Sequence, residues 1–187
     1  MTGYKILFDQ QQLRQRITEL GAEISAAYEG ESVVFVSMLK GSLYFLADLS
    51  RAVTIEANYD LVAVTSQKVR MQLTRDITLQ IEDKHVIVVE EIVRTGLTTN
   101  YLLQHLETKN PKSLQVCALL SNPNEQLIDL PMPFIGFMID QTRVIGYGMD
   151  YKEHGRTLPF IAKLDKSRFT KKKAKKSAPA NPLTLYP

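Results

Sequence analysis

The sequence has little of the material on which extracellular and membrane proteins depend. It contains one cysteine, no tryptophan, and no apolar run close to the ~20 residues of a membrane helix. A lone cysteine excludes a framework of disulfides within the chain. The first ten residues, MTGYKILFDQ, lack the charged and then apolar segments of an export signal. We therefore expect a cytoplasmic protein without membrane contact, in which Cys117, within the strand-like run VCALL, is a small core residue.

Acidic residues are absent from the segment 166–187, which holds seven of the 23 lysines and arginines. Without this segment the chain has a net charge of −4, although the whole chain carries +3. Its low apolar content favours a solvated extension, and a charge run alone is too unspecific to indicate a nucleic-acid partner. With 44% hydrophobic residues, the chain is expected to form one domain at 1–165, followed by a basic, flexible tail at 166–187.

Hydrophobic residues recur with two periods along this domain. Leu13, Ile17, Leu20 and Ile24 have the spacing of one helix face, and 42–52 is a second helical segment. Short apolar runs rich in β-branched residues predict strands, at 32–37, 59–66, 113–120 and 134–139. Helices alternating with such strands are typical of an α/β fold with a central, mostly parallel sheet flanked by helices.

The most informative stretch is 85–100, HVIVVEEIVRTGLTTN. Its uninterrupted apolar run predicts a strand buried on both faces, which ends at two adjacent carboxylates, Glu90 and Glu91. A helix is expected at 99–108, with Thr98 as its cap. The loop between strand and helix then lies at the carboxyl end of a strand, where open parallel sheets bind their ligands.

This loop, 94–98, has the composition of an anion cradle. Loop amides and a helix N-terminus attract negative charge. Gly96 permits close approach of a ligand to the backbone, and Thr95 and Thr98 can donate hydroxyl hydrogen bonds. The two preceding carboxylates can accept from sugar hydroxyls or help to hold a divalent cation. They also repel each other, which favours protonation of one until a cation or sugar arrives. The pattern indicates a ribose 5-phosphate.

Three motifs connect the chain to a known family. VVEEIVRTGLTT, at 88–99, resembles the phosphoribosyl-pyrophosphate signature of type I phosphoribosyltransferases. MLKGS, at 38–42, and VIGYGMDY, at 144–151, are similar to further motifs of the hypoxanthine-guanine branch. The resemblance implies the type I phosphoribosyltransferase fold with a small hood region. It also implies a homodimer or homotetramer that uses Mg²⁺ to transfer the phosphoribosyl group of phosphoribosyl pyrophosphate to a purine base, hypoxanthine or guanine, giving IMP or GMP and pyrophosphate in purine salvage.

The resemblance assigns roles to single positions. Lys40-Gly41 matches a pair with a cis peptide bond, whose amide contacts pyrophosphate. Glu90 and Glu91 match acids that hold the ribose hydroxyls and take part in metal binding, and Asp150 matches an acid that meets magnesium through water. Arg156 matches a pyrophosphate-binding arginine, whose planar fork can pair with two phosphate oxygens. The 5-phosphate is expected to bind to Arg94, Thr95, Gly96, Leu97 and Thr98.

Four departures from the family pattern cluster where the base is expected. Arg94 stands at the catalytic position of an aspartate that exchanges a proton with purine N7, and arginine cannot do so because its pKa exceeds ~12. Asn122 replaces a lysine that hydrogen-bonds the purine 6-oxygen. Arg143, next to Val144 in the predicted base site, replaces a stacking aromatic residue. The segment 65–76 is expected to be a lid loop shorter than in the relatives, which would exclude water less well.

These departures leave two hypotheses. In the first, the protein is a purine phosphoribosyltransferase, because positioning and charge stabilisation carry most of this reaction, and loss of a general base slows it by ~10²–10⁴-fold without abolishing it. In the second, it is a non-catalytic regulator that binds phosphoribosyl pyrophosphate or a nucleotide, since the phosphoribosyl half of the site is intact and the purine half is altered. We favour the enzyme.

Overall fold

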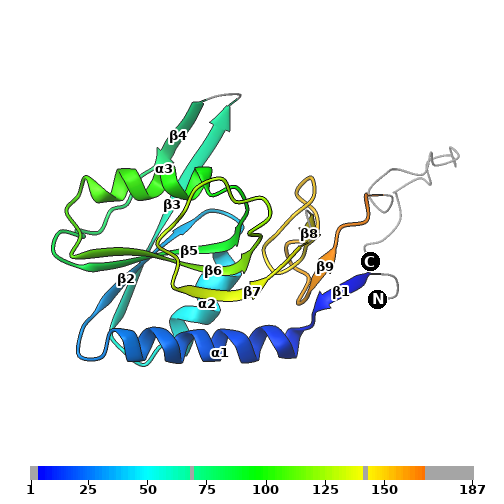
Figure 1. Ribbon diagram of the computed structural model, residues 1–187, viewed down its shortest axis with the longest axis horizontal. Helices are drawn as coiled ribbons and strands as arrows, with labels where there is room; N and C mark the ends of the chain where they lie inside the picture. Colours follow the sequence, from blue (N-terminus) through cyan, green and yellow to red (C-terminus); the bar gives the residue numbers. More distant parts are fainter. Residues whose placement is uncertain (1–3, 68–69, 141–142, 167–187) are drawn as a thin grey trace, which may run out of the picture.

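The computed structural model describes residues 4–67, 70–140 and 143–166 (Figure 1). The predicted basic tail lies outside these residues from position 167 onward. No helix in the described part of the chain has the length and apolar composition required to cross a membrane. The elements are, in chain order, β1 Lys5–Phe8, α1 Gln10–Ala27, β2 Val33–Met38, α2 Leu43–Ala52, β3 Ala57–Gln67, β4 Arg70–Arg75, β5 His85–Val93, α3 Leu97–Glu107, β6 Ser113–Ser121, β7 Phe134–Met138, β8 Val144–Ile145 and β9 Ile161–Lys163.

The main sheet has the strand order β4-β3-β2-β5-β6-β7. Neighbouring strands are parallel except β3 and β4, which are antiparallel. The central strands β2 and β5 are apolar over most of their length and buried on both faces, as expected of parallel strands that helices cover. Val33, the first residue of β2, pairs with His85, the first residue of β5, so the two strands begin at the same level and lead to the same edge of the sheet. The predicted α/β fold with a mostly parallel sheet is confirmed.

Helices cover both faces of this sheet, α1 and α2 on one and α3 on the other (Figure 1). The predicted inner face of α1 is confirmed, since Leu13, Ile17, Leu20 and Ile24 are all buried. Each face has a core of its own, between the sheet and its helices. Cys117 is fully buried in the core on the α1 side, as predicted. Burial raises the pKa of its thiol, which therefore stays protonated and unreactive.

The segment 65–76, expected to be a shortened lid loop, is largely strand. Here β3 and β4 pair as an antiparallel hairpin, which projects from the sheet edge beyond α3 in Figure 1. The sequence signal was a period of two: Met71 and Leu73 are half-buried, whereas Gln72 and Thr74 are exposed. The segment is therefore a paired hairpin, and its role as a short lid over the site stays a prediction.

The signature segment departs from its predicted boundaries in two ways. Strand β5 continues through both glutamates to Val93, because its parallel ladder with β6 extends that far. Helix α3 begins at Leu97, so Thr98 lies in its first turn and the prediction of Thr98 as the cap is wrong. Gly96 occupies the N-cap with a φ of 80°, a left-handed conformation that glycine adopts without steric cost. The chain therefore turns into the helix two residues earlier than expected.

A second, antiparallel sheet of β1, β9 and β8 stands beside the main sheet and forms the predicted hood (Figure 1). Its strands are two to four residues long. Such strands are too short to produce a periodic pattern, so none of them was predicted from the sequence. The hood carries the third motif, 144–151, whose first two residues form β8.

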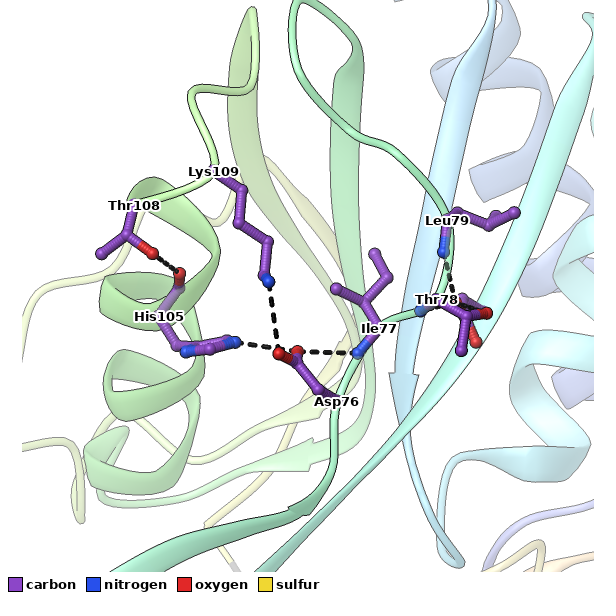
Figure 2. A network of polar contacts seen from close by, with 8 residues as sticks. Asp76, Ile77, Thr78, Leu79, His105, Thr108 and Lys109 are labelled. Carbon is purple, nitrogen blue, oxygen red and sulfur yellow. Dashed lines mark hydrogen bonds and ion pairs between the residues drawn. The ribbon is translucent and has the colours of Figure 1, made fainter.

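Polar contacts tie the base of the β3-β4 hairpin to α3 (Figure 2). Asp76, directly after β4, is hydrogen-bonded to Nε2 of His105 at 2.8 Å and accepts from Nζ of Lys109 at 3.2 Å. It also accepts from the backbone amide of Ile77 at 2.7 Å. Burial raises the pKa of Asp76, but the hydrogen bonds outweigh this effect, and the pKa lies below its usual value. Asp76 is therefore a carboxylate at neutral pH that links hairpin and helix.

A second aspartate, Asp60 of β3, fixes the chain that leaves the hairpin. Its side chain is buried and accepts from the amide and the hydroxyl of Thr78, at 2.6 and 2.8 Å. It also accepts from the amides of Leu61 and Leu79, at 2.7 and 3.0 Å. Burial raises the pKa of this carboxyl, but the four hydrogen bonds lower it by more, so the pKa lies below its usual value.

Asp60→Asn is expected to destabilise the protein by about 1–3 kcal/mol at neutral pH, because an amide carries no charge and accepts fewer hydrogen bonds. The folded pKa of Asp60 lies below the unfolded value. Its contribution is therefore present above the unfolded pKa and is lost as the pH falls through the folded pKa. Urea unfolding from about pH 7 to about pH 3 measures this, and the difference in free energy between wild type and variant should close at low pH.

The exposed Asp129 provides the control for this experiment, since Asp129→Asn changes the same groups outside any buried site. It is expected to alter the free energy of unfolding by less than about 0.5 kcal/mol. A difference between Asp60→Asn and wild type that stays constant with pH would contradict the role of the charge.

Candidate active site

A pocket of about 640 Å³ lies at the carboxyl ends of β2, β3 and β5. Loops that follow parallel strands meet at this edge of a sheet, and ligands bind there. Leu97 is the one residue predicted for phosphate, ribose or metal binding that does not line the pocket, and its side chain is exposed. The pocket brings together the others: Lys40, Gly41, Glu90, Glu91, Arg94, Thr95, Gly96, Thr98, Asp150 and Arg156.

Two glycines let the hood approach the loop after β2. A β-carbon at Gly148 in the hood would lie 1.8 Å from the carbonyl oxygen of Gly41, so the two backbones are in direct contact. A β-carbon at Gly41 would lie 1.9 Å from Oε1 of Glu91 and would displace that buried carboxylate. The absence of side chains at both glycines therefore lets the hood pack directly on Gly41, which lines the pocket.

The cis peptide bond predicted at Lys40-Gly41 lies one residue earlier, between Leu39 and Lys40. The predicted position is wrong because a non-proline cis bond has no residue signature of its own, so the motif does not define which bond it is. The side chain of Lys40 is exposed, and its Nζ pairs with Glu153 of the hood at 3.0 Å. This exposed ion pair joins the same two segments as the glycine contact.

Glu90 and Glu91 point to opposite faces of β5, because side chains alternate along a strand. Glu90 accepts a hydrogen bond of 3.3 Å from the hydroxyl of Thr99 in α3. Burial, and then the charge of Glu91, raise the pKa of Glu90 well above its usual value. Burial also raises the pKa of Glu91 to about 7, although the charge of Arg156 lowers it. The expected tendency toward protonation is present, with burial rather than repulsion as its main cause.

Arg156 is the centre of the polar contacts on the hood side. Its Nη2 pairs with Oδ1 of Asp150 at 2.7 Å, and its Nη1 donates to the carbonyl oxygen of Gly148 at 2.8 Å. Within the described part of the chain, its Nε is buried and has no hydrogen-bond partner. A buried donor without a partner costs free energy, so Arg156 is held here at some cost to stability. Asp150 and Arg156 thus form one preorganised pair at the pocket.

The N-terminus of α3 opens into the pocket and is suited to bind a phosphate. Gly96 turns the chain, and its carbonyl oxygen accepts the first helical hydrogen bond, from the amide of Asn100 at 2.8 Å. The amides at the first turn of a helix have no intrahelical acceptor and carry the positive end of the helix dipole. Thr95 and Thr98 line the pocket at this end. Together these groups are suited to bind an anion, and their role as an anion cradle stays a prediction.

A smaller pocket of about 180 Å³ adjoins the first. Arg143 and Val144, both predicted to bind the base, line it. Four residues line both pockets. Glu91, Ile92 and Arg94 belong to the signature segment, and Asp150 belongs to the hood. The structure therefore places these two predicted base-binding positions next to the predicted ribose and metal positions.

The third predicted base-binding residue, Asn122, does not line either of these pockets. It is buried at the end of β6, and its Nδ2 donates to Oε1 of Glu125 at 3.2 Å. The second oxygen of Glu125 pairs with Nε of Arg94 at 3.0 Å. Glu125 lines the larger pocket, so Asn122 is connected to that pocket through the carboxylate of Glu125.

No group of three or more His, Cys, Asp or Glu side chains in the described residues is arranged to hold a metal ion alone. Magnesium commonly binds through one or two carboxylates, substrate phosphates and water, and needs no such cage. Glu90, Glu91 and Asp150 all line the larger pocket and offer carboxylate oxygens of this kind. The donor set therefore fits Mg²⁺ that arrives together with a phosphate-bearing substrate.

Most of the chain matches one protein family. Residues 3–152 match the model described as the phosphoribosyl transferase domain. The chain belongs to the phosphoribosyltransferase family. Among curated relatives, the hypoxanthine-guanine phosphoribosyltransferase of Mycobacterium avium is 35% identical over 172 residues, which cover 86% of this chain and 85% of the relative.

Solved structures agree on the phosphoribosyltransferase fold. The hypoxanthine-guanine phosphoribosyltransferase of Bacillus anthracis has a TM-score of 0.82 and 37% identity, covering 85% of this chain and 95% of that protein. The hypoxanthine phosphoribosyltransferase of Staphylococcus aureus has a TM-score of 0.84 and 30% identity, covering 89% and 94%. The predicted resemblance to the hypoxanthine-guanine branch is confirmed, and with it the prediction of a phosphoribosyltransferase enzyme.

Four residues that build the site of this phosphoribosyltransferase were not singled out from its sequence. Gly148 carried a signal, since it is a glycine within the third motif. Thr99 supports the first glutamate, Glu153 pairs with both Lys40 and Arg156, and Glu125 holds the arginine of the signature loop. Glu153 and Arg156 are close in the sequence. The other partners are separated in the sequence and come together only in the folded chain.

Proposed function

We propose that this phosphoribosyltransferase transfers the 5-phosphoribosyl group of phosphoribosyl pyrophosphate to hypoxanthine or guanine, giving IMP or GMP and pyrophosphate in purine salvage. The observation that carries the proposal is one pocket in which a helix N-terminus, two strand-borne glutamates and the Asp150–Arg156 pair meet. The names of the relatives from M. avium and B. anthracis support the choice of base.

Each part of the pocket has a task in this reaction. The loop 94–98 and the first turn of α3 bind the 5-phosphate through amides and hydroxyls. Glu90 and Glu91 accept hydrogen bonds from the ribose hydroxyls. Arg156 and the backbone at Lys40-Gly41 bind the pyrophosphate, since these residues line the pocket and a guanidinium pairs well with phosphate oxygens.

The transfer exchanges one bond at C1′ for another. The base nitrogen N9 forms a bond to C1′ while the bond from C1′ to the pyrophosphate oxygen breaks, and pyrophosphate leaves with the bonding electrons. The proton of the base passes to solvent. Positive charge develops on the ribose, so orientation of the reactants and stabilisation of charge supply most of the rate. Mg²⁺ would be held by one or two carboxylates from among Asp150, Glu90 and Glu91, together with phosphate oxygens and water, and would supply positive charge to the pyrophosphate.

Release of pyrophosphate from phosphoribosyl pyrophosphate tests the proposal. The assay contains Mg²⁺ and hypoxanthine, guanine, xanthine or adenine in turn, with a control that lacks a base. We expect release that depends on the base and is fastest with hypoxanthine or guanine. Omission of Mg²⁺ with excess chelator should abolish it, because the pyrophosphate then lacks its counter-charge.

Folded protein that releases no pyrophosphate with any base would contradict the proposal. If it still bound phosphoribosyl pyrophosphate in a calorimeter, the non-catalytic regulator would be favoured instead. The relatives described above bear transferase names and give that alternative no support. The cytoplasmic location and the homodimer or homotetramer stay predictions.

A further inference from the structure

The base side of the site contains an arginine that a carboxylate holds in place. Nε of Arg94 pairs with Oε2 of Glu125 at 3.0 Å, and Nδ2 of Asn122 donates to Oε1 of the same carboxylate at 3.2 Å. Asn122 is only 1% exposed, and its backbone amide donates to the carbonyl oxygen of Val93 at 3.0 Å. These hydrogen bonds connect Arg94, through Glu125 and Asn122, to the buried ends of β5 and β6, and they orient its side chain.

The pairing through Nε leaves the two terminal nitrogens of the guanidinium available. In the described part of the chain, the hydrogen bond and ion pair of Arg94 both go to Glu125 through Nε. Arg94 lines the larger pocket and also the smaller one, in which Arg143 and Val144 lie. Its side chain is 42% exposed. A donor fork is thus presented where the two pockets meet.

An arginine fork requires two acceptors side by side. A 6-oxopurine offers such a pair on one edge, N7 and O6, and arginine binds this edge of guanine with two hydrogen bonds. A 6-aminopurine has a donor in place of O6, which faces the fork with the wrong polarity. We propose that Arg94 binds the N7/O6 edge of a 6-oxopurine and that Glu125 is its positioning residue. This inference rests on the proposed function, because it names what selects the base at the same site.

The geometry gives a physical account of two unusual residues at once. The amide nitrogen of Asn122 is engaged with Glu125 and lies outside the pockets, so the 6-oxygen needs another donor, and Arg94 is placed to supply it. Arginine cannot accept a proton. A guanidinium at N7 instead favours the base with its proton on N9, and its positive charge stabilises the negative charge that develops when N9 loses that proton to solvent.

A base without N7 tests the contact directly. 7-Deazahypoxanthine has a C–H group in place of N7 and keeps O6, so the fork loses one of its two acceptors. For the wild type, kcat/KM with hypoxanthine is expected to exceed that with 7-deazahypoxanthine by about 5- to 100-fold. In Arg94→Met, which keeps a long side chain without donors, this ratio should fall several-fold toward one. Arg94→Lys, with one compact ammonium, should lie between them.

Glu125→Gln tests the positioning role. The KM for hypoxanthine should rise by about 3- to 30-fold, because the guanidinium loses its charged partner. The KM for phosphoribosyl pyrophosphate should stay unchanged, which a general loss of structure would not permit. Glu125→Asp, which keeps the charge, should recover part of the loss. Glu107→Gln, at an exposed position of α3, is the matched control and should leave both constants unchanged.

Equilibrium binding of nucleotides tests the contact between Arg94 and N7 without requiring catalysis. Wild type should bind IMP more tightly than 7-deaza-IMP, and Arg94→Met should bind both alike. If wild type and Arg94→Met both release pyrophosphate and have the same ratio of kcat/KM between hypoxanthine and 7-deazahypoxanthine, the inference is overturned and the proposed function stays intact. If the wild type releases no pyrophosphate but prefers IMP to 7-deaza-IMP, and Arg94→Met loses this preference, the inference is supported and the proposed function is overturned.

Discussion

Gly148→Ala should abolish most of the transferase activity and also destabilise the fold. The added β-carbon would lie 1.8 Å from the carbonyl oxygen of Gly41, and neither backbone can move unless the hood separates from the loop after β2. The φ of Gly148, 96°, adds the strain of a side chain in a left-handed conformation. We expect a loss of about 3 kcal/mol or more in the free energy of unfolding and of at least about 100-fold in kcat/KM.

Gly30→Ala is the matched control for that variant. Gly30 also has a positive φ, 78°, but a β-carbon there would meet nothing within 4 Å. The control should therefore lose only about 1–2 kcal/mol through backbone strain and keep its kcat/KM. Urea unfolding and pyrophosphate release measure both effects. Equal losses in the two variants would show that the contact between Gly148 and Gly41 does not hold the hood in place.

Elements whose signal lies within their own segment could be predicted from the sequence. The inner face of α1 follows from the spacing of Leu13, Ile17, Leu20 and Ile24, and the structure buries all four. Strands β2 and β5 follow from apolar runs, because helices on both faces of a parallel sheet exclude polar residues. The motif at 88–99 also predicts an anion site from one segment, because its strand, loop and helix N-terminus are adjacent in the chain.

Features that depend on contacts between distant segments could not be predicted in this way. The hood strands are too short for a period and exist only because β9 pairs with both β1 and β8. Two adjacent glutamates predict the end of a strand, whereas β5 continues because β6 pairs with it up to Val93. Glu125 gave no local signal, since its role depends on Arg94, 31 positions earlier in the sequence.

Arg156→Lys should lower kcat/KM by about 10²–10³-fold, because one ammonium cannot replace three separate contacts. Nη2 of Arg156 pairs with Asp150 at 2.7 Å and with Glu153 at 3.3 Å, and Nη1 donates to the carbonyl oxygen of Gly148 at 2.8 Å. Lysine keeps the positive charge, so the variant separates the geometry of the fork from its electrostatic attraction. Steady-state kinetics of pyrophosphate release, with each substrate varied in turn, measure the effect.

The KM values for the two substrates should change by different amounts. This difference distinguishes a pyrophosphate contact from a general disturbance of the hood. If Arg156 binds pyrophosphate, kcat falls and the KM for phosphoribosyl pyrophosphate rises, while the KM for the base changes little. Arg51→Lys is the control: Arg51 is exposed, pairs with Asp48 and lies outside both pockets of the site. Equal rises in both KM values would contradict a specific contact, since disorder of the hood disturbs Val144 at the base and Asp150 at the metal position together.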